Sequence, residues 1–312
     1  MIEVKNVTKK YGSFVAVNDI SFTINDGEVV GFLGPNGAGK STTMNMITGY
    51  IEQTDGQIIV NGYDTIKKSK KAKQQIGYMP EGVPLYNDLT VKEFVTYMAE
   101  LHKVERKQKK EKVQSILKEV GLDSMQNKLI KNLSRGQKQR VSLAGTIVFD
   151  PKILILDEPT VGLDPKQITE IRSLIKELGK KHTVILSSHI LSEVSQICDR
   201  VIIINKGKIV AIDTPENLEK KVSDNNILYV TVEDPNNKVN KIKNEAITEI
   251  KMLKTNDDGT KQYEIRANEN VNLNKLVFSE FAKENITIFE MKKPEVTLED
   301  AFMKIIKEGD DK

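Results

Sequence analysis

The stretch Gly34-Pro35-Asn36-Gly37-Ala38-Gly39-Lys40-Ser41, followed by Thr42, decides the fold. It satisfies the pattern GxxxxGK[ST], and it stands between the apolar run 29–33 and a segment expected to be helical from about Lys40. Such glycines let backbone N–H groups wrap a phosphate, while the helix directs its positive N-terminal end at the same anion. The stretch predicts a nucleotide-binding loop, in which Lys40 reaches the β- and γ-phosphates, Ser41 ligates Mg²⁺ and Thr42 donates to a phosphate.

A strand that ends in two carboxylates follows farther along the chain. The run 153–156 is Ile-Leu-Ile-Leu, and Asp157 and Glu158 come directly after it. Alone, such a strand end is usually just solvated, but after a phosphate-binding loop it predicts the second half of a magnesium–nucleotide site. Asp157 is expected to hold Mg²⁺ through water or Ser41, and Glu158 to polarise the attacking water.

Length and composition indicate a globular protein of about two domains. The chain has 312 residues, of which 38% are hydrophobic and 29% charged. Its 47 basic and 44 acidic residues leave a net charge of +3, so no nucleic-acid partner is expected. The sequence has neither a long apolar run nor an apolar signal segment, which predicts a protein on the cytoplasmic side of any membrane it serves. One cysteine, Cys198, excludes an intrachain disulfide.

Hydrophobic periodicity separates strands from helices in the first part of the chain. Helical spacing appears at 94–101, after Thr90 and Glu93 at capping-box distance, and again at 113–120, before Gly121. These two amphipathic helices predict a helical subdomain inserted before the carboxylate strand. Alternating and apolar runs predict a half-exposed sheet and a mostly parallel one, with strands at 2–7, 20–24, 183–186, 201–204 and 208–212 and a hairpin turn at Lys206-Gly207.

Beyond a polar stretch at 222–226, the sequence predicts a second, smaller domain. The expected order is βαββαβ, the ferredoxin-like arrangement. A last helix near 298–306 is expected to begin at Thr297 as its cap. The division is thus 1–222 and 227–312, the second part having strands at 227–233, 247–254, 262–266 and 286–291, helices at 238–245 and 273–284, and a turn at 257–259.

The stretch Leu133-Ser134-Arg135-Gly136-Gln137 resembles the signature motif, usually LSGGQ, of ATP-binding-cassette (ABC) ATPases. Gly162-Leu163-Asp164-Pro165 resembles the D-loop of that family, and Ser187-Ser188-His189 resembles its switch histidine. All the motifs stand in the order of the family, over about the first 220 residues. The resemblance implies an α/β, P-loop NTPase cassette with a mostly parallel core sheet, an antiparallel β subdomain and a helical subdomain, here joined to a small α+β domain.

The resemblance also implies roles for single residues. In the family two cassettes pack head to tail, so Ser134 and Gly136 would bind the γ-phosphate of ATP on the partner's loop, within a signature in trans that also contains Arg135 and Gln137. Asp164 would belong to the D-loop, and His189 would contact the γ-phosphate and act in catalysis with Glu158 and Lys40. Tyr11 falls where the family stacks an aromatic ring on adenine.

The chain departs from the family pattern at two positions. Arg135 replaces the usual glycine of the signature, and this change leaves Ser134 and Gly136 in place. Glu81, in Met79-Pro80-Glu81, stands where a glutamine normally defines the Q-loop. A glutamate can still ligate Mg²⁺ or the attacking water, so Glu81 is retained as a metal-site residue.

A cassette followed by such a tail resembles the ATPase subunits of bacterial exporters whose membrane subunit is a separate chain. The implied protein binds and hydrolyses ATP with Mg²⁺, pairs with an identical or a paralogous cassette, and drives an integral membrane permease from the cytoplasmic face of the membrane as a peripheral subunit. The alternative is a soluble ABC ATPase of a ribosome- or DNA-associated machine. The implied relatives in that class carry two cassettes or a long coiled-coil insertion, and this chain has neither.

An apolar group near the Q-loop has two interpretations. Val83, Leu85, Tyr86 and Leu89 either receive a helix of the membrane partner or close the core of the helical subdomain itself. The sequence does not decide between them.

Overall fold

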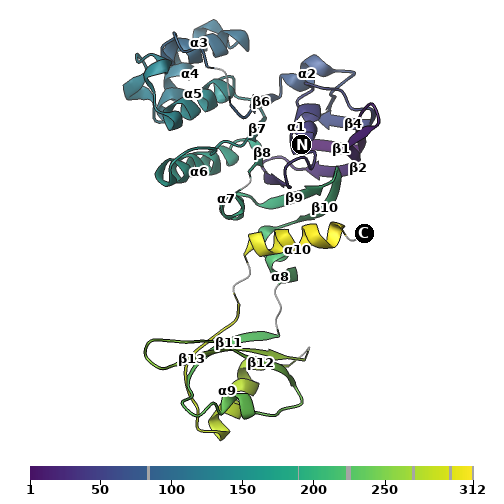
Figure 1. Ribbon diagram of the computed structural model, residues 1–312. Helices are drawn as coiled ribbons and strands as arrows, with labels where there is room; N and C mark the ends of the chain where they lie inside the picture. The colour runs from purple at the N-terminus through teal and green to yellow at the C-terminus, as the bar shows by residue number, and fades with distance from the viewer. Residues whose placement is uncertain (83–84, 189, 223–225, 269–270, 295–296, 311–312) are drawn as a thin grey trace. The chain divides into compact units, whose positions relative to one another are not determined.

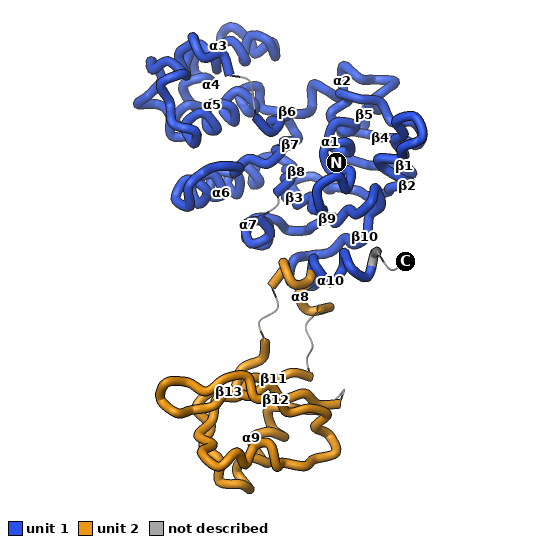
Figure 2. Tube along the Cα trace, in the orientation of Figure 1, with its two compact units in different colours: residues 1–218, 302–312 blue, residues 219–301 orange. Residues whose placement is uncertain are grey.

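The computed structural model describes residues 1–82, 85–188, 190–222, 226–268, 271–294 and 297–310. The chain divides into two compact units, which Figure 2 shows in blue and orange. The first comprises 1–218 with 302–312, and the second comprises 219–301. This division differs from the expected one at the C-terminal end, where the last helix contributes to the first unit.

A six-stranded sheet forms the centre of the first unit, in the order β10-β9-β3-β8-β7-β6. All neighbours pair in parallel except β10, which returns antiparallel to β9. Strands β3, β7 and β8 are buried along their whole length, as expected of parallel strands that are covered on both faces. Lys206 and Gly207 have φ angles of 46° and 77°, which confirms the predicted two-residue hairpin turn. The strands are β3 (Val29–Leu33), β6 (Ile76–Met79), β7 (Ile153–Asp157), β8 (Thr183–Ser187), β9 (Arg200–Asn205) and β10 (Lys208–Asp213).

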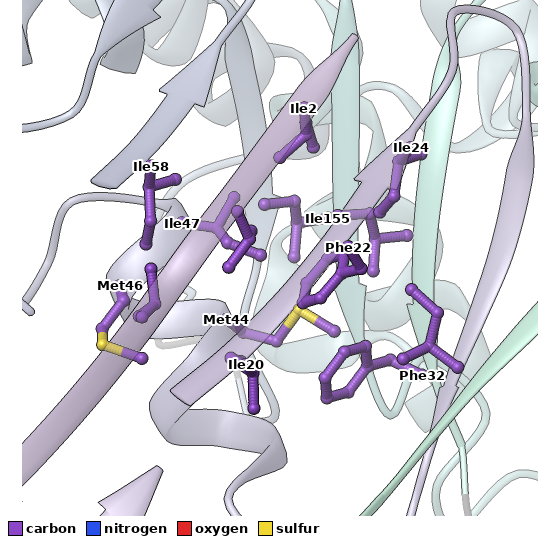
Figure 3. Close-up of a cluster of buried hydrophobic side chains, with 14 of the residues drawn as sticks. Ile2, Ile20, Phe22, Ile24, Phe32, Met44, Met46, Ile47, Ile58 and Ile155 are labelled. Atoms are coloured by element: carbon purple, nitrogen blue, oxygen red, sulfur yellow. The ribbon is translucent and has the colours of Figure 1, made fainter. Parts of the chain in front are cut away.

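A second, antiparallel sheet in the first unit has the order β2-β1-β4-β5, and Figure 1 shows its strands β1, β2 and β4. Its apolar face meets helix α1 and the core sheet in one buried cluster, which Figure 3 shows. The rings of Phe22 and Phe32, one from each sheet, lie 5.8 Å apart between centroids, and Met44 and Ile47 of α1 join them. The phosphate-binding loop therefore starts from a packed core. The elements are β1 (Ile2–Tyr11), β2 (Phe14–Ile24), β4 (Asp55–Val60), β5 (Tyr63–Asp64), α1 (Lys40–Ile47) and α2 (Ser69–Lys73).

The predicted helical subdomain contains the two expected helices and a third, α5. The capping box before the first of them is present, because Thr90 Oγ1 accepts from Glu93 N at 3.2 Å and Glu93 Oε2 accepts from Thr90 N at 2.8 Å. Gly121, with φ of 71°, follows the second helix as expected of a C-terminal glycine. The bounds are α3 (Val91–Leu101), α4 (Arg106–Glu119) and α5 (Arg135–Ile147), with 3₁₀ turns at Asp123–Met125 and Ile130–Asn132.

The remaining helices that contribute to the first unit are α6 (Pro165–Gly179) and α7 (Leu191–Ile197), which belong to it entirely, and α8 (Pro215–Val222) and α10 (Leu298–Asp310), each of which has residues in both units. Helix α10 begins as predicted at Thr297, whose hydroxyl accepts from Asp300 N at 3.2 Å. No helix of the described residues is both long and apolar enough to cross a bilayer.

The second unit contains a four-stranded antiparallel sheet with the order β12-β13-β11-β14. Residues from all four strands and from α9 build its core, with Tyr263 and Phe281 fully buried. The predicted helix at 238–245 is wrong, because only a 3₁₀ turn at Val239–Lys241 occupies this stretch. The ferredoxin-like arrangement is thus not confirmed in full. The elements are β11 (Ile227–Glu233), β12 (Ile247–Thr255), β13 (Lys261–Ala267), α9 (Leu273–Lys283) and β14 (Thr287–Lys292).

A buried carboxylate explains the missing helix. Asp234 is 1% exposed, and it accepts hydrogen bonds from Lys238 N at 2.7 Å, Val239 N at 3.1 Å and the Tyr263 hydroxyl at 2.8 Å. Farther on, Asn244 Oδ1 accepts from Ala246 N at 2.9 Å. Side chains of Asp and Asn that bind nearby backbone N–H groups hold a chain in turns and compete with a helix. A contact with the distant strand β13 therefore overrides the local pattern.

Candidate functional site

The phosphate-binding loop is pressed against two neighbouring strands. A Cβ on Gly34 would lie 2.3 Å from the carbonyl oxygen of Ile204 in β9, and one on Gly39 would lie 2.8 Å from that of Ala16 in β2. Gly39 also has φ of 107°, which disfavours any side chain. Both glycines are therefore required by the packing behind the loop, and they set its curvature.

Helix α1 begins inside this loop with a free N-terminus. Gly39 is its N-cap and supplies no side-chain hydrogen bond, so the first N–H groups of the helix have no side-chain acceptor. Thr43 stabilises the first turn, since both its N–H and its hydroxyl donate to Gly39 O at 2.9 Å. Unsatisfied N–H groups at the positive end of a helix are suited to bind phosphate.

These elements surround one cavity of about 300 Å³, which we call the phosphate cavity. It brings together most of the predicted loop residues, both carboxylates of the strand end and Glu81. Its lining comprises Phe14, Ala16, Asn36, Gly37, Gly39, Lys40, Ser41, Thr42, Glu81, Asp157 and Glu158. Folding thus joins side chains from the first hairpin, the loop and the end of β7 in one site.

Lys40 folds back over the loop that precedes it. Its Nζ donates to Gly34 O at 2.7 Å and to Pro35 O at 3.1 Å. Burial lowers the pKa of its ammonium group, while the charges of Glu158 and Asp157 oppose that effect. An ammonium group held by two carbonyl oxygens next to two carboxylates can exchange the carbonyls for phosphate oxygens when a nucleotide binds.

Ser187 holds the two carboxylate residues from the neighbouring strand. The register of β7 and β8 places it opposite Asp157, and its buried hydroxyl donates to Asp157 Oδ1. The same hydroxyl oxygen accepts from Glu158 N at 3.0 Å. The sequence indicates Ser187 only through its place in a segment that resembles the switch motif. Its positioning role depends on strand register, which no local pattern in the sequence shows.

Glu158 adopts a left-handed backbone conformation directly after β7. Its φ is 50°, a conformation that costs a residue other than glycine roughly 1–2 kcal/mol. The turn places Glu158 in the lining of the phosphate cavity. The residues that follow Glu158 are anchored to α7, because the Thr160 hydroxyl donates to the buried Glu193 Oε2 at 2.8 Å.

The oxygen donors of the cavity fit a magnesium ion that is bound together with phosphate. Ser41, Asp157 and Glu81 all line the cavity. No group of three or more His, Cys, Asp or Glu side chains in the described part of the chain is arranged to hold a metal by itself. Mg²⁺ does not require such a group, because it takes one or two carboxylates, substrate phosphates and water.

The signature residues form the N-terminal cap of α5. Ser134 Oγ accepts from Gln137 N at 3.3 Å, and Gln137 Oε1 accepts from Ser134 N at 3.0 Å. This capping box leaves the N–H groups of Arg135 and Gly136 at the start of the helix, where no intrahelical acceptor exists. Ser134 can also donate its hydroxyl proton. The stretch has the donors that an anion site needs, although its capping box was not predicted from the sequence.

Asp164, the D-loop residue, caps the next helix. Its Oδ1 accepts from Gln167 N at 2.9 Å, and Pro165 occupies the first position of α6. This arrangement is a regular helix start. Asp164 therefore has a structural role as a helix cap, in addition to the D-loop role that the resemblance implies.

Two further predictions concern aromatic and histidine side chains. Tyr11 is 50% exposed and does not line the phosphate cavity, whereas Phe14, its partner across the β1–β2 hairpin, does. The assignment of Tyr11 to adenine stays a prediction, and Phe14 is a residue that no sequence motif indicated. His189 lies outside the described residues, so its predicted contact with the γ-phosphate also stays a prediction.

Known proteins are similar to this chain in sequence. The family model described as "ABC transporter" matches residues 17–161. The linearmycin resistance ATP-binding protein LnrL of Bacillus subtilis (strain 168) is 38% identical over 233 residues, which are 74% of this chain and 75% of that protein. The bacitracin transport ATP-binding protein BcrA of Bacillus licheniformis is 35% identical over 311 residues, which are 99% and 98% of the two chains. This chain belongs to the family of ABC transporter ATP-binding proteins.

Solved structures share the fold of this ABC ATPase. The protein cbiO1 from Clostridium perfringens, described as part of the ABC transporter complex cbiONQ, aligns with a TM-score of 0.64 and 30% identity, over 71% of this chain and 93% of that one. A dimeric ATP-binding cassette, MJ0796, in a post-hydrolysis state with ADP and Pi aligns with a TM-score of 0.62 and 28% identity, over 69% and 98%. The predicted α/β cassette fold is therefore confirmed. As a member of this family, the chain is an ATP-binding and ATP-hydrolysing subunit, and the non-transport alternative finds no support.

Proposed function

We propose that this ABC ATPase binds MgATP in the phosphate cavity, pairs head to tail with a second cassette, and drives export through a separate integral membrane subunit. One observation supports the pairing most directly. Of the described residues that line the phosphate cavity, none belongs to the signature 133–137. The donors of Ser134 and Gly136 are therefore offered to a nucleotide held by another cassette, which can be an identical or a paralogous chain.

Within this proposal each residue of the cavity has a defined task. Lys40 neutralises the β- and γ-phosphates, and the N-terminus of α1 binds them through N–H groups. Ser41 and Asp157 would hold Mg²⁺, with Glu81 lining the same cavity, and the ion would neutralise charge that develops on the phosphate oxygens. Glu158 would accept the proton of the attacking water, and His189 would contact the γ-phosphate.

The relatives support export as the purpose of hydrolysis. Their printed names refer to linearmycin resistance and to bacitracin transport. The description of cbiO1 as part of a transporter complex supports a separate partner subunit. The chain would then act at the cytoplasmic face of the membrane as a peripheral subunit, with the substrate selected by its partner.

An apolar hollow on the helical subdomain suits a helix of that membrane subunit. It measures about 640 Å³ and is lined by the stretch 85–89 and by Tyr97. Tyr86 is 54% exposed, and its ring packs edge-on against Tyr97 at 5.6 Å between centroids and near Phe94 at 6.3 Å. The aromatic rings thus contact the subdomain and still present apolar surface to a partner. Val83, the other apolar residue named for this surface, lies outside the described residues.

The proposal is tested by trapping the complex in native membranes. Glu158→Gln protein loaded with ATP and Mg²⁺ is expected to keep its nucleotide sandwich closed, so that the membrane subunit co-purifies and can be identified by mass spectrometry. Glu158→Gln carrying Lys40→Ala is the control, because it cannot hold the phosphates. Recovery of ribosomal proteins in place of a polytopic membrane protein would contradict the proposal.

A further inference from the structure

The unusual residue of the signature, Arg135, packs directly on the D-loop of its own chain. A Cβ placed on Gly162 would lie 2.1 Å from Cζ of Arg135 and 2.2 Å from its Nη1. The guanidinium group therefore fills the space above Gly162, whose φ of 69° also favours glycine. The residue that departs from the family pattern thus covers the D-loop.

Further contacts continue along the same side of α5. A Cβ on Gly136 would meet Gln167 Oε1 at 2.6 Å, so the lack of a side chain at Gly136 lets Gln167, in the first turn of α6, lie against the start of α5. Gln139 Nε2 donates to Pro159 O at 2.8 Å, one residue after Glu158. Arg140 completes the row with an ion pair to Glu170 at 2.6 Å. We call this set of contacts between α5 and the segment 159–170 the seam.

The positive charge of Arg135 does not stabilise its own helix, α5. The first turn of α5 contains no acidic residue, and a cation at a helix N-terminus is unfavourable. Within the described ranges, the Arg135 side chain makes neither an ion pair nor a hydrogen bond. Instead it lines a cleft of about 510 Å³ together with Lys138, Glu81 and Glu158. Its close approach to Gly162 is the contact from which we argue its role.

We propose that Arg135 is a positioning residue that couples the signature helix to the D-loop of the same chain. Its planar guanidinium group holds the backbone at Gly162 against the start of α5, so that the seam extends to the signature and the two segments move as one body. When Ser134 and Gly136 bind the nucleotide of the partner cassette, the D-loop and the adjacent Glu158 move with the signature helix into the positions needed for hydrolysis. This inference rests on the proposed pairing of two cassettes.

Two other roles for Arg135 make different predictions. A direct ligand of the partner's γ-phosphate would act mainly through its charge, so its loss would raise KM for ATP and a lysine would restore much of the binding. A solvated surface cation would change neither constant. A positioning role requires the flat shape of the guanidinium group, so its loss lowers kcat, leaves KM nearly unchanged, and is not repaired by lysine.

The first experiment measures steady-state ATP hydrolysis by the full-length protein and its variants. For Arg135→Ala we expect kcat to fall by about tenfold or more, with KM for ATP within about twofold of the parent. Arg135→Lys is expected to resemble Arg135→Ala. Lys138→Ala is the matched control, because Lys138 lines the same cleft on the same helix and is not among the groups nearest to Gly162; it should leave both constants near the parent values.

A second measurement is independent of turnover. The sequence contains no tryptophan, so Leu163→Trp introduces a single reporter into the D-loop. In nucleotide-free protein we expect Arg135→Ala, and not Lys138→Ala, to lower the fluorescence anisotropy of this tryptophan. The inference would be overturned if Arg135→Ala changed neither the anisotropy nor kcat. It would also be overturned if Arg135→Ala raised KM for ATP and Arg135→Lys restored it. If the parent itself fails to hydrolyse ATP, the proposed function fails, whereas the anisotropy comparison still decides this inference.

Discussion

At the scale of single residues, the candidate site contains a glutamate held in an unfavourable backbone conformation. Glu158 lines the phosphate cavity with φ of 50°, and its N–H donates to Ser187 Oγ at 3.0 Å. Replacing Glu158 with glutamine preserves the shape of the side chain and removes the proposed proton acceptor. We expect kcat for ATP hydrolysis to fall by about 10²–10⁴-fold while ATP binding persists. Equilibrium binding of ATP and steady-state hydrolysis check the two parts, and an unaltered rate would exclude Glu158 as the base.

Ser187 provides a second test at this scale. Ser187→Ala leaves the buried Asp157 carboxylate and the Glu158 N–H without their shared partner, which should cost about 1–3 kcal/mol in the free energy of unfolding and also lower kcat. Ser195→Ala is a suitable control, because Ser195 is in an exposed hydrogen bond to Ser192 O. Chemical denaturation of both variants measures the difference, and equal stabilities would show that the Ser187 hydroxyl does not support the site.

Lys40 should make ATP binding weaken at alkaline pH. Burial lowers its pKa from the ordinary value of 10.5, so the ammonium group loses its proton, and its attraction for phosphate, earlier than a free lysine as pH rises. ATP affinity should therefore decline on the alkaline side, beginning below pH 10.5. Lys40→Met should bind ATP more weakly and lack this decline, which equilibrium binding across a pH series measures. A parallel decline in both proteins would assign it to another group.

At the scale of elements, the start of α3 is predictable because its signal is local. Thr90 and Glu93 form the capping box that their spacing predicts. Thr90→Ala should cost about 1 kcal/mol in the free energy of unfolding, since a helix N-terminus loses an acceptor. Thr96→Ala, in the middle of the same helix, removes a hydroxyl that only donates to Lys92 O and should cost less. If denaturation gave both variants the same stability, the cap would contribute nothing.

Elements that depend on distant contacts were not predictable. The helix expected at 238–245 is replaced by a 3₁₀ turn because Asp234 is buried against Tyr263, 29 positions away. The position of Ser187 opposite Asp157 likewise follows from the pairing of β7 and β8. The phosphate-binding loop was predictable because all its determinants are adjacent in sequence, whereas Phe14 joins the site only through packing.

At the scale of the whole molecule, the last helix and the second unit can be tested separately. Phe302, Ile305 and Ile306 of α10 are half-buried and belong to the first unit. Ending the chain after Val222 removes them, which should cost about 2 kcal/mol and lower the Tm by roughly 4–8 °C. Thermal unfolding monitored by circular dichroism measures this. A shortened chain without α10 that unfolds at the parent's Tm would show that the helix adds no stability.

We propose that the second unit modulates the pairing of cassettes. Replacing residues 223–296 with a flexible linker keeps α10 and removes the sheet β11–β14. We expect the shortened protein to remain folded, with altered ATP-dependent dimerisation and altered hydrolysis. Analytical ultracentrifugation with and without ATP makes the comparison, and identical dimerisation and ATPase rates would exclude this role.

The central claim is that each ATP is hydrolysed between the phosphate cavity of one chain and the signature of another. Mixing two inactive variants tests it most directly. Lys40→Ala disables the cavity, and Ser134→Asp keeps an N-cap while repelling the γ-phosphate. Each variant alone should be inactive, and an equimolar mixture should regain about a quarter of the parent ATPase rate, because half of the dimers are mixed and each has one intact site. A Ser134→Asp protein that is fully active alone, or a mixture that regains no activity, would contradict the account.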